Sequence, residues 1–256
     1  MKIAGRTLGP GHPCFIVAEI SSNHMGSPSN AYKLIDCAWW AGADAVKLQA
    51  FTLEEILSLR GEGQAPPPWD AYTKRELYTQ ALTPLGWLPG LFNHARGRGI
   101  IPFSSVFGPT SLAALEAVDC PAYKIAKPDA GDMTLAQAVV ATGKGVVVSY
   151  GDGISGNYAN ADLAVLHCPP GYPTPLRDVM LPDFAEPGGW ERCGLSSHCL
   201  VPELAVAAVA RGASILEYHL KLNATRPLDD AFSHTPQSFK DMVDAVRQTE
   251  ALCHAA

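Results

Sequence analysis

The sequence lacks the features that direct a protein into a membrane, along the secretory route or onto nucleic acid. No apolar run reaches the roughly 18 residues of a membrane-spanning helix, and the opening MKIAGRTLG contains no hydrophobic signal-peptide core. Lysine and arginine do not cluster, and the formal net charge is −6. An acidic chain can bind an anion only through donors gathered in a cleft. We therefore expect a cytoplasmic protein with no nucleic-acid and no membrane partner.

Cysteine usage excludes two further classes of small domain. The seven cysteines are an odd number and include no Cys-x-x-Cys pair, which argues against a disulfide framework and against a zinc ribbon. The 256 residues are 47% apolar, enough to bury a sizeable core. This size fits one domain of the barrel class.

Short β-rich runs alternate with helical segments along the chain. Eight such runs favour a parallel α/β sheet closed into a (β/α)8 TIM barrel, with residues 1–256 as a single domain. An open doubly wound sheet is the rival topology. The predicted strands are 15–20, 45–50, 100–106, 122–127, 143–150, 163–168, 193–197 and 215–220.

One stretch interrupts this alternation. Residues 58–71 include GEGQAPPPWD, which is too rich in Gly and Pro for regular structure. We interpret 58–71 as a loop insertion and expect it to fold over the mouth of the barrel.

Polar side chains stand near the carboxyl ends of the predicted strands, where a closed barrel gathers them at one mouth. His198 and His219 end two consecutive strands and would lie side by side, which predicts a divalent-metal site. Lys47 and Lys124 suit capture of a phosphate or carboxylate, or a Schiff base. Hydroxyl donors for a phosphate cradle would come from Ser104, Ser105, Ser149 and Ser196.

Two glutamates supply acid–base groups to the same mouth. Glu19 interrupts an otherwise apolar run, so its carboxylate needs a partner or a task. Glu217 stands two residues before His219, and this spacing sends both side chains to one face of a strand. Either glutamate could manage protons while a metal polarises a carbonyl. The combination suits carbon–carbon bond formation on a phosphorylated substrate.

A series of motifs resembles a known family over residues 15–239. In order along the chain they are FIVAEISSNHMGS, AGADAVKLQAF, AYKIAK, VVVSYGDGI, LHCPPGYPTPLRDV, CGLSSH and ILEYHL. Together they resemble the barrel domain of the sialic acid synthase (N-acetylneuraminate synthase) family. These enzymes condense phosphoenolpyruvate with an N-acetylated sugar aldehyde to give nine-carbon 2-keto acids. The resemblance implies a transferase of carbohydrate biosynthesis whose partners are phosphoenolpyruvate and an aldehyde or sugar acceptor.

The resemblance also implies roles for single residues. His198 and His219 match the ligands of a divalent metal, manganese or magnesium, that polarises the acceptor's aldehyde. Glu19 matches the catalytic carboxylate near the reacting carbons. The phosphoenolpyruvate binders would be Lys47, Ser105, Lys124, Ser149 and Ser196. The residues in acceptor-binding positions are Gln49, Tyr172 and one of Asp229 and Asp230, whose spacing to Ser233 is one residue shorter than usual.

The sequence departs from the family pattern where the acceptor binds. Lys127 replaces a phosphate-binding serine, and Asp129 shortens an acid that holds the sugar. Pro169 and Pro170 replace a Thr-Asn pair and so delete an amide that contacts substrate. The phosphoenolpyruvate half of the site therefore looks retained and the acceptor half rebuilt. Lys127 would then pair with the same phosphate or bind an acidic acceptor.

Two further departures bear on the metal and on assembly. Ser197 stands where an aspartate normally precedes the first metal histidine. Family members also carry a C-terminal antifreeze-like domain that donates an arginine to the sugar of the partner subunit. The present sequence ends at Ala256 without a counterpart, so we expect the barrel domain alone and leave a homo-oligomer open.

Two other hypotheses remain open at this point. A Schiff-base aldolase or lyase would use Lys124 or Lys127 and would need no metal. A barrel that binds a ligand without catalysis would keep the architecture alone.

Overall fold

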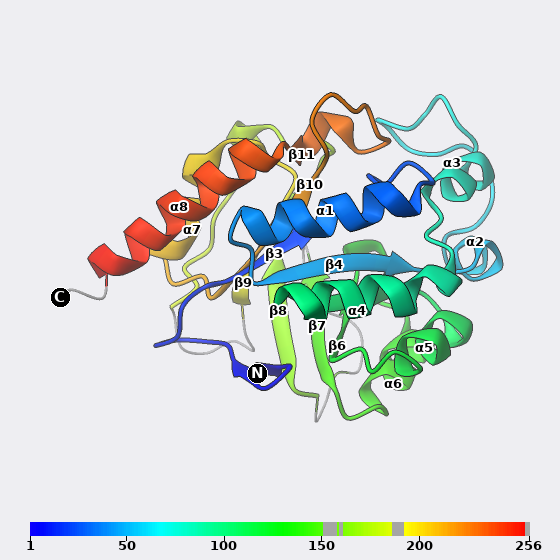
Figure 1. Cartoon of the computed structure of the whole chain (residues 1–256), viewed down its shortest axis with the longest axis horizontal. Coiled ribbons are helices and arrows are strands. Elements are labelled where there is room, and N and C mark those ends of the chain that lie inside the picture. The colour runs from blue at the N-terminus through cyan, green and yellow to red at the C-terminus, as the bar shows by residue number, and fades with distance from the viewer. Residues whose placement is uncertain (151–157, 159–160, 186–191, 254–256) are drawn as a thin grey trace.

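Eight parallel strands form a closed barrel in the structure, a computed structural model that describes residues 1–150, 158, 161–185 and 192–253 (Figure 1). Neighbouring strands follow one another in chain order, and β10 pairs with both β9 and β3, which closes the sheet. The predicted (β/α)8 barrel is therefore confirmed. The barrel strands are β3 (Phe15–Glu19), β4 (Ala45–Ala50), β5 (Ile101–Val106), β6 (Ala122–Ile125), β7 (Gly145–Tyr150), β8 (Leu163–His167), β9 (Arg192–Ser197) and β10 (Ile215–Leu220).

Helices cover the outside of this barrel, and Figure 1 shows α1 and α4 flanking β4. In the described residues they are α1 (Pro28–Trp40), α2 (Leu53–Arg60), α3 (Lys74–Ala81), α4 (Leu88–Arg98), α5 (Pro109–Glu116), α6 (Met133–Val140), α7 (Pro202–Ala210) and α8 (Pro236–Cys253). Short 3-10 turns add η1 (Leu85–Trp87), η2 (Lys127–Asp129), η3 (Leu176–Asp178) and η4 (Asp230–Phe232). No helix in the described ranges is long and apolar enough to span a membrane.

The apolar strand residues pack beneath these helices in one continuous core. Ile16, Val46 and Leu216 are fully buried or nearly so, as are Leu34 of α1 and Phe239 of α8. Burial of this contiguous apolar surface supplies the main driving force for folding. The core also fills the inside of the barrel, because Val17 and Phe103 are buried on the inner strand face, two residues before Glu19 and Ser105. The polar groups of the mouth lie at the carboxyl end of that face.

A small hairpin lies at the amino ends of the barrel strands. Strands β1 (Lys2–Ile3) and β2 (Arg6–Thr7) pair in antiparallel fashion. The backbone N–H of Lys2 donates to Asp162, the residue before β8, at 2.9 Å, and Ile3 is buried in the core. This hairpin, which the sequence analysis did not predict, therefore packs at the end of the barrel away from the polar mouth.

The insertion at 58–71 is partly regular. Its first three residues are the last turn of α2, which begins after Thr52 with a capping box: Thr52 Oγ1 accepts from Glu55 N, and Glu55 accepts from Thr52 N. These reciprocal bonds satisfy two of the free N–H groups of the first turn. The irregular part runs from Gly61 to Thr73, where a second capping box starts α3. We call residues 61–73 the mouth loop.

Two other segments complete the comparison with the sequence. Strand β11 (Ser233–His234) pairs with the end of β10 and was not predicted. Most of the segment 151–160, which follows β7, lies outside the described residues.

Candidate active site

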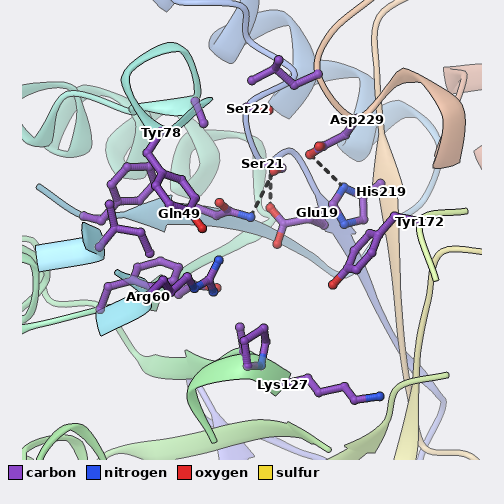
Figure 2. Close-up of a pocket in the computed structure, with 18 of the residues that line it drawn as sticks. Glu19, Ser21, Ser22, Gln49, Arg60, Tyr78, Lys127, Tyr172, His219 and Asp229 are labelled. Atoms are coloured by element: carbon purple, nitrogen blue, oxygen red, sulfur yellow. Dashed lines mark hydrogen bonds and ion pairs between the residues drawn. The ribbon is translucent and has the colours of Figure 1, made fainter. Parts of the chain in front are cut away.

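A cavity of about 480 Å³ opens at the carboxyl ends of the barrel strands, where the predicted site residues gather (Figure 2). Its wall includes side chains from seven of the eight strands or the residues directly after them, and from α2, α3 and the mouth loop. The predicted residues that line it are Glu19, Lys47, Gln49, Ser105, Lys124, Lys127, Ser149, Tyr172, Ser196, His198, Glu217, His219 and Asp229.

Two lysines and two glutamates form a buried ionic network in this wall. Lys47 Nζ contacts Glu19 Oε2 and lies 3.8 Å from Glu217 Oε2, while Lys124 Nζ lies 3.8 Å from Glu217 Oε1. None of the four side chains is more than 7% exposed. Two positive and two negative charges balance, which lets the site hold four ionic groups away from water. We call these four residues the lysine–glutamate network.

Serine hydroxyls surround the network as the sequence predicted. Lys47 Nζ donates to Ser105 Oγ at 3.2 Å, and Lys124 Nζ donates to Ser149 Oγ at 2.6 Å. Ser196 Oγ donates to Glu217 Oε1 at 2.9 Å. The sheet register sets the last of these contacts, because Ser196 stands opposite Glu217 on the neighbouring strand. Ser105 and Ser149 each lie two residues beyond the register partner of the lysine that donates to them. The cavity wall therefore offers ammonium and hydroxyl donors side by side, the groups that bind a phosphate or carboxylate.

Burial changes the ionisation of two members of the network. It lowers the pKa of Lys47 to about 8, although the negative charge of Glu217 opposes the shift. For Glu217 burial acts to raise the pKa, but attraction to Lys124 and Lys47 outweighs it and leaves the pKa below its usual value. Lys47 therefore titrates near physiological pH while Glu217 stays ionised.

Glu19 is fixed by the loop that follows its own strand. Its Oε1 accepts from the backbone N–H of Ser21 at 2.5 Å, and Ser21 Oγ accepts from Gln49 Nε2 at 3.0 Å. Figure 2 shows Glu19, Ser21 and Gln49 joined in this way at the centre of the cavity wall. The carboxylate thus has a defined position beside Lys47.

The two predicted metal ligands are neighbours. The ring centroids of His198 and His219 lie 5.3 Å apart, and Phe232 packs edge-on against both rings at 5.4 and 4.9 Å. Asp229 Oδ2 lies 3.5 Å from His219 Nδ1, and within the described chain neither His198 Nδ1 nor His219 Nδ1 has a hydrogen-bond partner. Burial, together with the charges of His219 and nearby lysines, holds the pKa of His198 well below its usual range.

These residues fit part of a divalent-metal site. Neutral imidazole is a metal ligand, and an unpartnered buried ring nitrogen on His198 is consistent with that use. However, the described residues contain no group of three or more His, Cys, Asp or Glu side chains arranged to hold a metal. A cation held by His198 and His219 would therefore take its remaining ligands from substrate and water.

Three predicted residues do not reach the cavity. Ser104 Oγ donates to the carbonyl oxygens of Leu48 and Ser105, because consecutive strand residues point to opposite faces and Ser105 occupies the inner one. Both carboxylate oxygens of Asp129 accept from Arg60, at 3.0 and 2.6 Å.

Asp230 is the third, since it accepts from Lys221 at 2.5 Å away from the cavity. Of the two consecutive aspartates, Asp229 is the one that faces the site, a choice that the sequence alone left open.

Lys127 follows β6, and Pro169 and Pro170 follow β8; only the lysine reaches the cavity. Lys127 lines it, and its Nζ donates to the carbonyl oxygen of Cys168 at 3.1 Å. Pro169 and Pro170 do not line it. The two prolines therefore add no contact surface to the cavity wall.

Trp69 of the mouth loop packs on the aromatic side chains that lie next to the two histidines. Trp69 Nε1 donates to the carbonyl oxygen of Leu228 at 2.9 Å. The Trp69 ring packs against Tyr172 at 5.1 Å and Phe232 at 5.8 Å, and Tyr172 packs against His198 at 4.2 Å. An aromatic layer therefore separates the histidines from solvent on this side.

Sequence reasoning missed the residues that form the wall opposite the histidines. Arg60, Lys74 and Tyr78 come from α2 and α3, and each lines the cavity. None follows a barrel strand directly, so the rule that polar residues gather at strand ends could not find them. The available signal was a short run of helix formers with caps around residues 52–60, hidden beside the Gly/Pro-rich stretch.

Comparison with known proteins agrees with this architecture. The model of the NeuB family matches residues 34–255. Pseudaminic acid synthase of Campylobacter jejuni is 36% identical over 255 residues, which covers 93% of this chain and 74% of that protein. Human N-acetylneuraminate-9-phosphate synthase is 27% identical over 96% of this chain and 73% of its own length. Among solved structures, N-acetylneuraminic acid synthetase of Leptospira borgpetersenii, in complex with citrate, superposes with a TM-score of 0.85 at 25% identity, covering 99% of this chain and 89% of that chain.

Proposed function

The chain belongs to the NeuB family, and from this premise we propose that it condenses phosphoenolpyruvate with an aldehyde acceptor to give a 2-keto acid and inorganic phosphate. The observation that carries the proposal is the lysine–glutamate network with its serine hydroxyls, placed beside two adjacent histidines in one cavity. The similarity to pseudaminic acid and N-acetylneuraminate-9-phosphate synthases supports a sugar or sugar-like aldehyde as acceptor.

We assign phosphoenolpyruvate to the lysine side of the cavity. Lys47 and Lys124 would neutralise the phosphate and carboxylate, while Ser105, Ser149 and Ser196 would donate to their oxygens. Lys127 reaches the same region and would add a third cation. An enol phosphate held in this way presents its C3 carbon toward the acceptor side.

The reaction makes two bonds to carbon and breaks one. C3 of phosphoenolpyruvate bonds to the aldehyde carbon, the oxygen of a water molecule bonds to C2, and the C2–O bond to phosphate breaks. Of the two protons of that water, one ends on the aldehyde oxygen, which becomes a hydroxyl group, and the other leaves with phosphate as C2 becomes the ketone. Glu19 lies at the centre of the wall and is the group we assign to proton transfer, with its position fixed by Ser21 and its charge balanced by Lys47.

His198 and His219 would hold a divalent cation, manganese or magnesium, that acts as a Lewis acid on the aldehyde carbonyl. The two imidazoles sit under the aromatic layer of Trp69, Tyr172 and Phe232, which excludes water from this end of the cavity. Asp229 orients the His219 ring through its Nδ1 atom.

Product identification tests the proposal. Incubation with phosphoenolpyruvate, Mn²⁺ and aldoses of four to six carbons, followed by mass spectrometry, should reveal a 2-keto acid three carbons longer than the acceptor. A pyruvate product without an adduct would reject the condensation.

The lysine mechanism needs a separate experiment. Borohydride treatment with a keto substrate should leave Lys124 and Lys127 unmodified, because Lys124 already donates to Ser149 and lies beside Glu217. A covalent adduct on either lysine would favour the Schiff-base aldolase instead.

A further inference from the structure

The cavity wall opposite the histidines carries its own group of cationic and hydroxyl side chains. Arg60 ends α2, Lys74 begins α3, and Tyr78 lies one turn further along α3. Figure 2 shows Arg60 and Tyr78 on one side of the cavity and His219, Tyr172 and Asp229 on the other, with Glu19 and Gln49 between them. We call Arg60, Lys74 and Tyr78 the distal wall.

Arg60 is held rigidly in this wall. Its Nε and Nη2 donate to the two carboxylate oxygens of Asp129, whose side chain is 1% exposed. The guanidinium also lies over the Phe107 ring at 5.2 Å and the Tyr78 ring at 5.9 Å. This pairing uses two of the five guanidinium donors, and the Tyr78 side chain also interacts with the guanidinium, so the donors that remain serve a ligand. Arg60 is therefore a preorganised donor at the cavity surface.

The distal wall has an excess of positive charge. Lys74 Nζ donates to the carbonyl oxygen of Arg60 at 2.6 Å, and among the described residues no carboxylate forms an ion pair with Lys74. Asp129 is thus the single acid set against two cations. Apolar neighbours in the same wall, Phe51 and Leu77, lower the local polarity and strengthen the field that a ligand would meet.

The arrangement reverses the chemistry expected at Asp129. A free carboxylate there would accept hydrogen bonds from the hydroxyl groups of a neutral sugar. Here both oxygens are taken by Arg60, so the cavity presents donors where an acceptor of hydrogen bonds was expected. A ligand that matches this wall brings acceptor oxygens and negative charge.

We propose that the distal wall binds an anionic group, a phosphate or a carboxylate, at the end of the acceptor that lies furthest from its aldehyde. The inference rests on the proposed condensation, since it places the aldehyde at His198 and His219 and the remainder of the acceptor across the cavity. Arg60 supplies the bidentate contact, and Lys74 adds a second charge. Asp129 acts as a positioning residue that fixes Arg60.

Acceptors of equal carbon number show whether the charge of the distal group or the length of the acceptor determines the rate. D-mannose, D-mannose 6-phosphate and D-mannuronate have the same number of carbons and differ in the distal group, and D-erythrose with D-erythrose 4-phosphate forms a shorter pair. Phosphate release from phosphoenolpyruvate gives kcat/KM for each, and calorimetry without phosphoenolpyruvate gives binding. The two anionic six-carbon compounds distinguish phosphate from carboxylate.

In the wild-type chain the preferred anionic acceptor should exceed its neutral counterpart in kcat/KM by about 30-fold, as expected for a charge-assisted bidentate contact. Arg60→Gln should remove most of this preference, with a much larger loss of kcat/KM for the anionic acceptors than for the neutral ones. Lys74→Gln should reduce the preference for the anionic acceptor by roughly fivefold. Because Lys74 is partly exposed, this variant tests the distal wall even if Arg60→Gln does not fold. Arg75→Gln removes a neighbouring charge that pairs with Glu62 at the surface, and should change nothing.

Equal use of neutral and anionic acceptors would overturn the inference, as would an equal loss for both in Arg60→Gln, since that result indicates a structural role. Calorimetry keeps the two proposals apart. If no aldehyde causes phosphate release from phosphoenolpyruvate, the proposed condensation is wrong. Tighter binding of the anionic compounds that is lost in Arg60→Gln would still support the anion site in that case. If condensation proceeds without any charge preference, only the anion site fails.

Discussion

Lys47 is the residue whose ionisation should be visible in kinetics. Its burial lowers its pKa to about 8, so the side chain is charged below that pH and neutral above it. Because a neutral lysine attracts an anion less, kcat/KM for phosphoenolpyruvate should fall as pH rises through about 8. A pH profile of initial rates at low substrate concentration measures this limb.

The Lys47→Arg variant serves as the control for that profile. Arginine keeps its charge throughout the range, so the limb near pH 8 should disappear even if the rate is lower at every pH. A limb that stays in place in this variant would assign the titration to another group.

His24, in the loop after β3, should make the stability of the protein depend on pH in the acid range. Its ring is buried, Nδ1 accepts from Gly26 N at 3.1 Å and Nε2 contacts Thr83 Oγ1 at 2.9 Å. Burial lowers its pKa from 6.5 to about 4, so between these values the unfolded chain binds more protons than the folded one. Stability should therefore decrease as pH falls from 6.5 to 4, by up to about 3 kcal/mol from this residue.

Urea unfolding at pH 7, 5.5 and 4.5 measures that loss. His24→Gln has no titrating ring and should show a smaller decrease over the same interval, even if it is less stable at pH 7. An identical decrease in the variant would contradict the assignment to His24.

Local sequence patterns predicted which strand residues face the inside of the barrel. They did not predict contacts between residues that are far apart in the chain. The two-residue spacing of Glu217 and His219 placed both in the cavity, because side-chain alternation in a strand is local geometry. The same alternation allowed only one of Ser104 and Ser105 to face inward. The Arg60–Asp129 pair spans 69 positions, a separation across which local sequence patterns carry no information.

At the level of elements, the mouth loop is the part whose mobility should matter for activity. Trp69 ties it to Leu228 and to the aromatic layer over His198. Trp69→Ala should expose the cavity, lower kcat/KM for the acceptor by roughly tenfold, and make residues 61–73 more sensitive to protease. Limited proteolysis with mass mapping, alongside steady-state rates, tests both effects.

Trp39→Ala is a matched control, because Trp39 lies on α1 with 49% of its surface exposed and does not line the cavity. Substrate should slow cleavage of the wild-type loop and have little effect on Trp69→Ala. Cleavage at the same rate with and without substrate in the wild type would mean that the loop does not close over the mouth.

The sequence predicted that residues 58–71 are irregular, but not that α2 enters them. Thr52 and Glu55 cap that helix locally, yet the Gly/Pro-rich run beside it obscured the signal. The contacts of Trp69 are with residues more than a hundred positions away, so only the closed barrel brings them together.

For the molecule as a whole, closure of the barrel depends on the contact of β9 with β10. Gly194 pairs with Ile215 there, and a Cβ atom at Gly194 would lie 1.9 Å from the Ile215 carbonyl oxygen. Gly194→Ala should therefore force the strands apart and cost about 3 kcal/mol or more, the range of severe core substitutions. Denaturant unfolding measures the difference.

Gly97→Ala is the comparison, since nothing lies within 4 Å of a Cβ at that position in α4. This change should stabilise the protein by about 0.5–1 kcal/mol through a lower backbone entropy cost. Equal stabilities of the two variants would show that β9 and β10 tolerate a wider spacing.

The overall fold was predictable because it rests on a repeated pattern. Each of the eight predicted strands overlaps one strand of the barrel, and their alternation with helices indicated a parallel sheet. The pairing of β10 with both β9 and β3 shows that this sheet is closed and not open. The hairpin of β1 and β2 escaped prediction because its strands have two residues each, too few for a periodic signal.

One cavity brings together the lysine pair that we propose binds phosphate and the histidine pair that we propose binds a metal. Phosphate release from phosphoenolpyruvate tests this proposal most directly, measured with and without an aldehyde and with and without Mn²⁺. We expect release only when both the aldehyde and Mn²⁺ are present, and a loss of at least about 100-fold in His219→Gln. Release that needs neither aldehyde nor metal, or that is unchanged in His219→Gln, would contradict it.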